Sequence, residues 1–322
     1  MRIFIAGHGG MVGSAILRLL RAEGVHQVIT ADRCDLDLTD QAQVRAFMQA
    51  QRPDAVVLAA AKVGGIMANA TQPADFITDN LLIATHVIHA AHDAGVRHLV
   101  QLGSSCIYPR DAAQPMAEEA LLTGPLEPTN APYAIAKIAA IKLCESYNLQ
   151  HGHDYRSLMP TNLYGPGDNF HPAHAHVLPA LLSRFHQAVQ SGAKAVTIWG
   201  SGAPRREFLH VDDLAAALLF VMRLDPVAYR AETTPTRSHL NIGWGQDISI
   251  RDLAQMIAEM TGFRGQILYD TSKPGGTPRK LLDTARMQRL GWRPQIALPN
   301  GLRQTFDWYL SQHRAGLALR CA

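Results

Sequence analysis

A short apolar run at the start of the chain leads directly into a glycine-rich turn, and this combination restricts the fold more than any other feature. Residues 2–6 (RIFIA) suit a buried strand, and Gly7, Gly10 and Gly13 follow it. Glycines at this spacing allow a tight turn, close approach of a pyrophosphate to the backbone, and close packing of the next helix on the strand. The segment therefore predicts the first βα unit of a dinucleotide-binding sheet, with phosphate at the helix N-terminus.

The first half of the chain continues this alternation of strands and helices. Its strand candidates are apolar throughout, which indicates a parallel sheet covered on both faces. The predicted strands are 2–6, 27–31, 55–60, 98–102 and 155–158, and the predicted helices are 11–23, 41–51, 73–94 and 133–151. We therefore predict an α/β fold built on a Rossmann-type doubly wound parallel sheet.

The second half of the chain has a different composition. Residues 160–175 are rich in proline, glycine and asparagine, which predicts a loop. Further elements are expected as a strand at 196–199 and helices at 212–224, 250–261 and 298–312. The mixture predicts a smaller α/β lobe after the large sheet.

The length of 322 residues suits one large domain and a smaller one. We expect a dinucleotide-binding domain over residues 1–170, to which a segment at about 211–243 returns. The smaller, substrate-binding lobe is expected over residues 171–322, interleaved with the first domain.

Charge and cysteine content exclude several classes of protein. A net charge of +3 without runs of like charge gives no reason to expect a nucleic-acid or membrane partner. The first apolar run is too short for a signal peptide, and no run reaches the roughly 18 apolar residues of a spanning helix. The four cysteines, none in a CxxC pair, are Cys34, Cys106, Cys144 and Cys321. We expect a cytoplasmic protein with reduced cysteines and no metal site.

The end of the second predicted strand carries conflicting signals about the cofactor. An acidic residue there accepts a hydrogen bond from the ribose 2′-hydroxyl of NAD, whereas an arginine accommodates the 2′-phosphate of NADP. Asp32 lies at a suitable separation after Gly13, and Arg33 follows it directly. The residues alone leave both cofactors open.

A tyrosine and a lysine four residues apart provide the first sign of chemistry. Tyr133 and Lys137 lie on one face of a predicted helix, where the ammonium is expected to lower the pKa of the phenol. Ser104 follows the fourth predicted strand, at the edge where parallel sheets bind ligands. Glycine turn, strand-end serine and YxxxK together indicate hydride transfer to a carbonyl.

Longer segments carry a resemblance to a known family. They are GH at 7–8 with GMVGS at 10–14, AAAKVGGI at 59–66, GSSCIYP at 103–109, EPTN at 127–130, PYAIAK at 132–137, MPTNLYGP at 159–166, REFLHVDD at 206–213 and GTPRKLLD at 276–283. With these segments the chain resembles the GDP-L-fucose synthases of the extended short-chain dehydrogenase/reductase family nearly end to end. The resemblance implies a homodimer that inverts C3 and C5 of GDP-4-dehydro-6-deoxy-D-mannose and reduces its C4 ketone with NADPH.

The resemblance also implies roles for a cysteine and a histidine. Ser104 and Tyr133, supported by Lys137, would hold the ketone oxygen, Cys106 would be the base of epimerisation, and His176 the acid. An extended segment would aim Ser104 and Cys106 to the same side, and a modest lowering of the thiol pKa would suit the base. By residue type alone, a buried structural role is favoured for Cys106 over a catalytic one. The histidines at 171, 174 and 176 have no acidic or cysteine cluster that would support a metal.

Cofactor and substrate residues follow from the same segments. The cofactor residues are Gly7, Gly10, Met11, Val12, Gly13, Asp32, Arg33, Ala59, Ala60, Tyr133, Lys137 and His176. For the GDP-sugar, the resemblance gives Arg184, Arg206 and Lys280 to the diphosphate. Trp199 is a candidate for the guanine pocket and equally for a core tryptophan, and Asn162 is a further candidate contact of the sugar.

The sequence departs from the family pattern at one cofactor position. Gly9 stands where the family has an arginine that contacts the cofactor phosphate. With Asp32, this departure leaves NADH open beside the NADPH that the resemblance implies. Two further alternatives stay open: a sibling enzyme on another GDP-4-keto sugar, with one inversion or reduction only, and a non-catalytic cofactor sensor. The sensor is expected to lack Ser104, Tyr133 or Lys137, and all three are present.

Overall fold

A computed structural model describes residues 1–171, 175–272 and 277–314 of the chain. Its centre is a six-stranded, fully parallel sheet in the order β2-β1-β3-β4-β5-β9. The strands are β1 (Arg2–Ala6), β2 (Gln27–Ile29), β3 (Ala55–Leu58), β4 (His98–Leu102), β5 (Asp154–Pro160) and β9 (His239–Ile242). The predicted doubly wound sheet is confirmed, although β2 and β3 are two residues shorter than the apolar pattern indicated.

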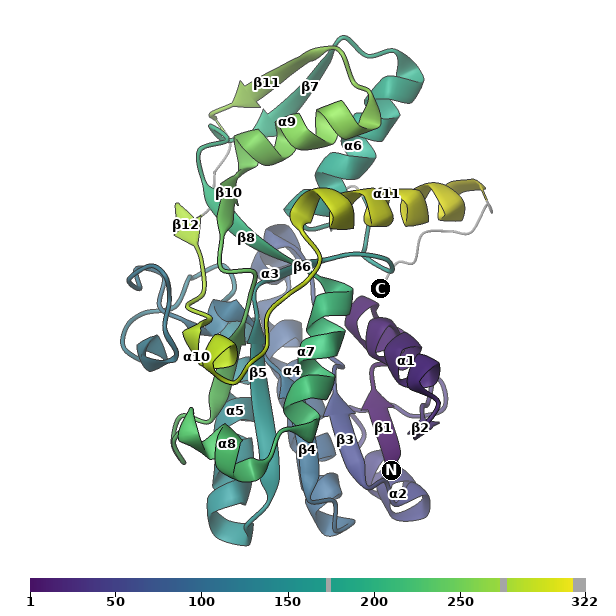
Figure 1. Cartoon of the computed structure of the whole chain (residues 1–322), viewed down its shortest axis with the longest axis vertical. Helices are drawn as coiled ribbons and strands as arrows, with labels where there is room; N and C mark the ends of the chain where they lie inside the picture. Colours follow the sequence, from purple (N-terminus) through teal and green to yellow (C-terminus); the bar gives the residue numbers. More distant parts are fainter. Residues whose placement is uncertain (172–174, 273–276, 315–322) are drawn as a thin grey trace.

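Helices cover both faces of this sheet (Figure 1). One face carries α1 (Met11–Glu23) and α7 (Val211–Arg223), and the other carries α2 (Gln41–Gln51), α4 (Pro73–Asp93) and α5 (Ala131–His151). Side chains alternate along β1, so that Ile3 and Ile5 pack towards α1 and α7, while Phe4 packs towards α2 and α4. Burial on both faces explains why the strands are apolar throughout.

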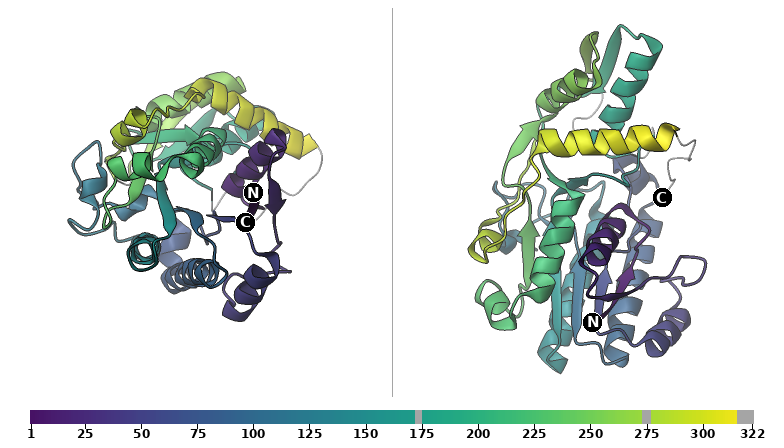
Figure 2. Two further views of the ribbon diagram at one scale, coloured as in Figure 1. Left: turned by 60° about the horizontal axis from the view of Figure 1, so that its bottom comes forward. Right: turned by 45° about the vertical axis from the view of Figure 1, so that its right-hand side comes forward.

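A smaller lobe is built around β8 (Arg205–His210). This strand pairs with β6 (Asn162–Tyr164), β10 (Asp247–Ser249) and β12 (Arg279–Lys280). The pair β7 (Ala195–Trp199) and β11 (Gln266–Asp270) packs with α6 (Val177–Ser191) and α9 (Ile250–Thr261). Figure 2 shows α11 (Leu298–Arg314) crossing between this lobe and the large sheet.

The remaining elements are short. They are α3 (Ile66–Thr71), the 3₁₀ turns η1 (Ser105–Ile107) and η2 (Glu118–Ala120), α8 (Pro226–Ala231) and α10 (Ala285–Arg289). The prediction of an uninterrupted loop over 160–175 is wrong, because β6 lies inside it and pairs with β8. In the predicted returning segment, β9 is the sixth strand of the large sheet; the domain boundaries stay a prediction. None of the helices in the described residues is long and apolar enough to span a bilayer.

Candidate active site

The glycine turn after β1 leaves no room for side chains at two of its positions. A Cβ at Gly13 would overlap the carbonyl oxygen of Gly7, and Gly7 itself has a φ of +89° and lies against the backbone of Ala60. Gly10 differs: a Cβ there would meet only the Gly7 carbonyl, at 3.6 Å. Gly10 is also exposed and caps α1 without a side-chain partner. The backbone N–H groups of this helix end are therefore accessible, which fits the pyrophosphate of a dinucleotide.

Other predicted cofactor residues surround this turn. Met11 and Val12 open α1, and Ala59 follows β3, where its N–H donates to Ala6 of β1 (3.0 Å). Because β1 and β3 are parallel neighbours, their carboxyl ends meet at one edge of the sheet. The structure thus gathers the glycine turn and the β3 segment as the sequence predicted.

Asp32 and Arg33 lie just beyond β2, and both are exposed. The Asp32 carboxylate lies 3.4 Å from Nε2 of His8 in the glycine turn, and its side chain is 72% exposed. The Arg33 guanidinium acts electrostatically on Asp37, whose pKa is lowered mainly by hydrogen bonds from Thr39. A carboxylate and a guanidinium thus both stand just after β2, where the sequence predicts contacts with the cofactor ribose.

Ser104 and Cys106 follow β4 in a tight turn. Ser104 caps the 3₁₀ turn η1, and its Oγ accepts a hydrogen bond from the Cys106 N–H (3.4 Å). The expectation of an extended segment is therefore wrong, because the chain coils at once after the strand. The turn nevertheless keeps the two side chains together, and Cys106 is 6% exposed.

Tyr133 and Lys137 lie in the first turns of α5, as the YxxxK spacing predicted. Lys137 Nζ donates to the carbonyl of Leu102, the last residue of β4 (2.8 Å), and lies 5.7 Å from the ring centre of Tyr133. This bond fixes the lysine between helix and strand. It thereby brings the pair next to the Ser104–Cys106 turn.

The ionisation of this pair differs from expectation. Burial, followed by the nearby Cys106 thiol, raises the pKa of Tyr133, so the predicted lowering by Lys137 is wrong as a net effect. Burial also lowers the pKa of Lys137 to about 8, although Cys106 partly opposes this. Desolvation disfavours both charged forms and outweighs the attraction between them. At neutral pH the phenol therefore carries its proton.

The Cys106 thiol shows the same dominance of burial. Burial raises its pKa, against the opposing influence of the Lys280 ammonium, the Ser104 hydrogen bond and Lys137. The expected lowering of the thiol pKa is therefore wrong, because the residue is withdrawn from water between η1 and its neighbours. Two cations close to the thiol nevertheless favour its thiolate form.

His176 caps the start of α6, on the side of the smaller lobe. Its side chain is open to solvent, yet enough protein surrounds it that desolvation lowers its pKa, with a further contribution from Lys280. Lys280 acts electrostatically on both Cys106 and His176, and this shared influence links the three side chains. His174 lies outside the described residues.

Arg206 and Lys280 are paired cations on neighbouring strands. Arg206 of β8 and Lys280 of β12 are partners in the parallel register. Burial lowers the pKa of both, and Arg206 lowers that of Lys280 further. Two like charges side by side are unfavourable by themselves, so an anion between them is stabilising. This pairing suits a diphosphate.

The other predicted substrate residues lie on β6, α6 and β7. The Asn162 side-chain amide donates to the carbonyl of Glu207 (2.7 Å) and so ties β6 to β8. Arg184 donates to the carbonyl of Thr197 (2.8 Å), two residues before Trp199, whose side chain is 56% exposed. Arg184 and Trp199 therefore lie together on the smaller lobe, where their roles stay predictions.

Comparison with known proteins agrees with this geometry. The family model described as "NAD dependent epimerase/dehydratase family" matches residues 3–243. The chain belongs to this epimerase/dehydratase family.

The chain is similar over nearly its whole length to proteins named for the metabolism of GDP-linked sugars. "GDP-L-fucose synthase" of Escherichia coli (strain K12) is 58% identical over 96% of this chain and 96% of the relative. "GDP-L-fucose synthase 1" of Arabidopsis thaliana is 54% identical over 96% and 93%. A solved structure, "GDP-mannoheptose C4 reductase from Campylobacter jejuni with NADP bound", has 37% identity and a TM-score of 0.88, covering 96% of this chain and 98% of the other. The predicted family and fold are confirmed.

One buried carboxylate of this family member escaped the sequence analysis. Glu207 is 0% exposed and accepts hydrogen bonds from backbone N–H groups of Gly245 and Leu282. It stands in the REFLHVDD segment, but no spacing distinguishes it from its neighbours. Its role is apparent only in the folded chain, where its hydrogen-bond donors come from segments distant in the sequence.

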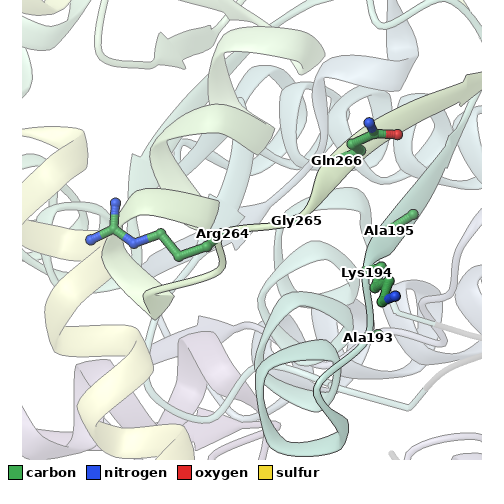
Figure 3. A pocket seen from close by; sticks show the side chains of 6 residues that line it. All are labelled: Ala193, Lys194, Ala195, Arg264, Gly265 and Gln266. Atoms are coloured by element: carbon green, nitrogen blue, oxygen red, sulfur yellow. The ribbon is translucent and has the colours of Figure 1, made fainter.

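Two surface hollows of the described residues lie away from the candidate cluster of Cys106, Tyr133, Lys137, His176 and Lys280. The open hollow in Figure 3 lies between the turns that precede β7 and β11, with Lys194 and Arg264 on its two sides. A second hollow lies between α1 and α7. Neither hollow is lined by a residue of this cluster. The candidate active site is therefore identified by the residue types and contacts of the cluster and not by a hollow. Among the described residues, no group of three His, Cys, Asp or Glu side chains is arranged to hold a metal ion.

Proposed function

We propose that this enzyme epimerises C3 and C5 of GDP-4-dehydro-6-deoxy-D-mannose and reduces its C4 ketone, forming GDP-L-fucose. The observation that carries the proposal is a connected set of charges and proton donors: Cys106 acts electrostatically on Tyr133 and Lys137, and Lys280 acts on both Cys106 and His176. A thiol, an imidazole and a phenol around one ketone are the groups that both steps require.

Epimerisation needs a polarised carbonyl, a base and an acid. Ser104 and Tyr133 donate hydrogen bonds to the C4 oxygen and stabilise the enolate that forms when a neighbouring C–H bond loses its proton. Cys106 removes that proton, and Lys280 with Lys137 favours the thiolate that does so. His176 returns a proton to the opposite face, and its lowered pKa makes it a ready donor once protonated.

Reduction uses the same oxygen site. The nicotinamide cofactor supplies the hydride. Tyr133 enters this step protonated, because burial raises its pKa, and it donates its proton to the oxygen as the ketone becomes an alcohol. Lys137, held by the Leu102 carbonyl, orients the phenol and stabilises the transient phenolate.

The nucleotide part binds through cations of the smaller lobe. Arg206 and Lys280 take the diphosphate, with Arg184 as a further cation. Trp199 stacks on the guanine, and Asn162 lies beside the sugar on β6.

The proposed reductant is NADPH, with weakened selection against NADH. Asp32 beside His8 offers an acceptor to a ribose 2′-hydroxyl, while exposed Arg33 offers a partner to a 2′-phosphate. Steady-state rates with the two cofactors should differ by less than about a thousandfold. Asp32→Ser should shift the preference towards NADPH, and Arg33→Ala towards NADH. A thousandfold or greater preference of the wild type for NADPH would refute this assignment.

Reduction without epimerisation is the second candidate. The raised pKa of Cys106 favours it, because less thiolate is present at neutral pH, and one relative is named a C4 reductase. Incubation of the GDP-4-keto sugar in D2O, followed by NMR of C3 and C5, separates the two candidates. Deuterium should enter both carbons with wild type and neither with Cys106→Ser, which still reduces the ketone. Exchange at the wild-type rate in Cys106→Ser would exclude that thiol as the base.

The same proposal includes a homodimer and a cytoplasmic location. Both rest on the likeness to the GDP-L-fucose synthases and on the reduced cysteines. Light scattering on the purified protein tests the dimer, and fractionation of the source cells tests the location.

A further inference from the structure

Glu207 carries a buried carboxylate at the junction of several chain segments. Its Oε1 accepts a hydrogen bond from the Gly245 N–H (2.6 Å), and its Oε2 accepts one from the Leu282 N–H (3.0 Å). The Trp244 N–H and the Thr161 hydroxyl also favour the carboxylate, whereas burial raises the pKa of Glu207 to about 6. The carboxylate thus joins the loop after β9 to the segment after β12.

The surrounding backbone is shaped to this carboxylate. A Cβ at Gly243 would overlap the Glu207 carboxylate, so the loop can approach it only with glycine at that position. The backbone carbonyl of Glu207 accepts hydrogen bonds from Asn162 (2.7 Å) and Thr161 (3.3 Å). Glu207 therefore connects β6, the β9–β10 loop and the segment after β12 at one point.

The segment after β12 has a particular need for such an anchor. Strand β12 has two residues, of which Lys280 pairs with Arg206 of β8. Repulsion between these cations opposes the pairing of β12 with β8, although the Arg206 guanidinium also donates to the Thr277 carbonyl just before β12 (2.6 Å). Side chains alternate along a strand, so Glu207 points to the face of β8 opposite Arg206. On that face its carboxylate accepts the hydrogen bond from the N–H of Leu282, two residues after Lys280.

We propose that Glu207 is a positioning residue for a nucleoside diphosphate: it holds β12 against β8 so that Lys280 stays beside Arg206. Glu207 acts only through the backbone of Leu282 and the β9–β10 loop, and touches no substrate. The inference rests on the proposed function and deepens it, because it says how the diphosphate site keeps two cations together.

Glu207→Gln tests this role through ligand affinities measured by calorimetry. The amide keeps the volume but replaces one acceptor oxygen by a donor, so that either Gly245 or Leu282 loses its partner. The Kd for GDP should rise at least about tenfold, while the Kd for NADPH stays within about twofold. Gly243→Ala, which displaces the same carboxylate from the other side, should give the same selective loss and serves if Glu207→Gln does not fold.

A matched control is available in Glu118. This carboxylate is 2% exposed and accepts a hydrogen bond from the Asn241 N–H (2.9 Å), outside the cation pair. Glu118→Gln should lower the melting temperature without changing the Kd for GDP. In a Lys280→Met background, Glu207→Gln should weaken GDP binding by less than about twofold, because its effect passes through Lys280.

Several results would overturn the role of Glu207. They are unchanged GDP affinity in Glu207→Gln, equal losses of GDP and NADPH affinity, an equal effect of Glu118→Gln, or full additivity with Lys280→Met. Wild-type protein that does not bind GDP would overturn both this role and the proposed function. Wild-type binding that Glu207→Gln leaves intact would overturn the role of Glu207 alone.

Discussion

The two proposed nucleotide-binding regions of this molecule differ in which groups would contact the ligand. The dinucleotide region is a backbone feature, in which glycines between β1 and α1 expose N–H groups within one stretch of seven residues, 7–13. The diphosphate region is made of side-chain charges, Arg206 and Lys280, which lie far apart in the sequence and meet only through strand pairing. The first binds anions through a shape that the chain adopts locally; the second depends on the assembled lobe.

The proposed reacting groups form a third cluster, next to Lys280 of the diphosphate region, and their removal should have the largest effect. Tyr133→Phe deletes the proton donor of the reduction while leaving both nucleotide regions intact. We expect single-turnover oxidation of NADPH to slow by about 10²- to 10⁴-fold at saturating NADPH, with the Kd for GDP within about twofold of wild type. Reduction at more than about a tenth of the wild-type rate would show that another group donates the proton.

How much of the molecule could be predicted from sequence follows the same division. The bounds of β1, α1, α2, β4 and α9 were predicted to the residue, because apolar periodicity and turn glycines are local signals. The three-residue strand β6 was missed inside a Pro- and Gly-rich loop, since its only support is pairing with β8. Strand register between distant segments leaves no local trace. The pairing of Arg206 with Lys280 was therefore not predictable.

The candidate site divides in the same way. Tyr133 and Lys137 lie in one helix, so their spacing predicted their proximity correctly. The direction of the pKa shifts was wrong for Tyr133 and Cys106, because burial in the folded protein dominates both and spacing carries no information on burial. Glu207 escaped detection for the same reason, since only its seclusion from water and its distant donors distinguish it.

The next largest effect is expected from two glycine substitutions in the dinucleotide region, which should weaken binding of the dinucleotide. Gly13→Ala places a methyl group against the Gly7 carbonyl, so we expect the free energy of unfolding to fall by about 1–3 kcal/mol or more. Gly10→Ala meets no such obstacle, since Gly10 has a φ of −77° and a Cβ there would make only an ordinary contact with the Gly7 carbonyl at 3.6 Å, so this variant should keep wild-type stability.

Both variants should nevertheless lose dinucleotide affinity, on the order of a hundredfold, because a methyl at either position prevents close approach of the pyrophosphate. GDP affinity should stay near wild type in Gly10→Ala. Chemical denaturation and calorimetry provide the two measurements. Normal NADPH binding by Gly10→Ala would show that the pyrophosphate does not approach this turn.

The pH dependence of epimerisation should show how strongly the diphosphate region acts on Cys106 through Lys280. Burial raises the pKa of the thiol, so at neutral pH the thiolate is a minor form, and exchange at C3 and C5 should rise about tenfold per pH unit until that pKa is reached. Removing a cation disfavours the thiolate, so Lys280→Met should move the profile to higher pH. Exchange measured by NMR in saturating substrate would contradict this if it fell with rising pH, or if Lys280→Met moved the profile to lower pH.

The smallest expected effect is a difference in salt dependence between the GDP affinity and the NADPH affinity. The diphosphate held between Arg206 and Lys280 interacts with two full positive charges. The N-terminus of α1 offers the dinucleotide only N–H groups and a partial charge of about half a unit. Raising the ionic strength from about 0.05 M to about 0.5 M shortens the Debye length several-fold, so GDP affinity should weaken several-fold and NADPH affinity less. Arg206→Gln should reduce the salt dependence for GDP only. Equal slopes for both ligands in wild type would mean that the dinucleotide, too, is held chiefly by side-chain charge, and Arg33 beyond β2 would then be the first residue to substitute.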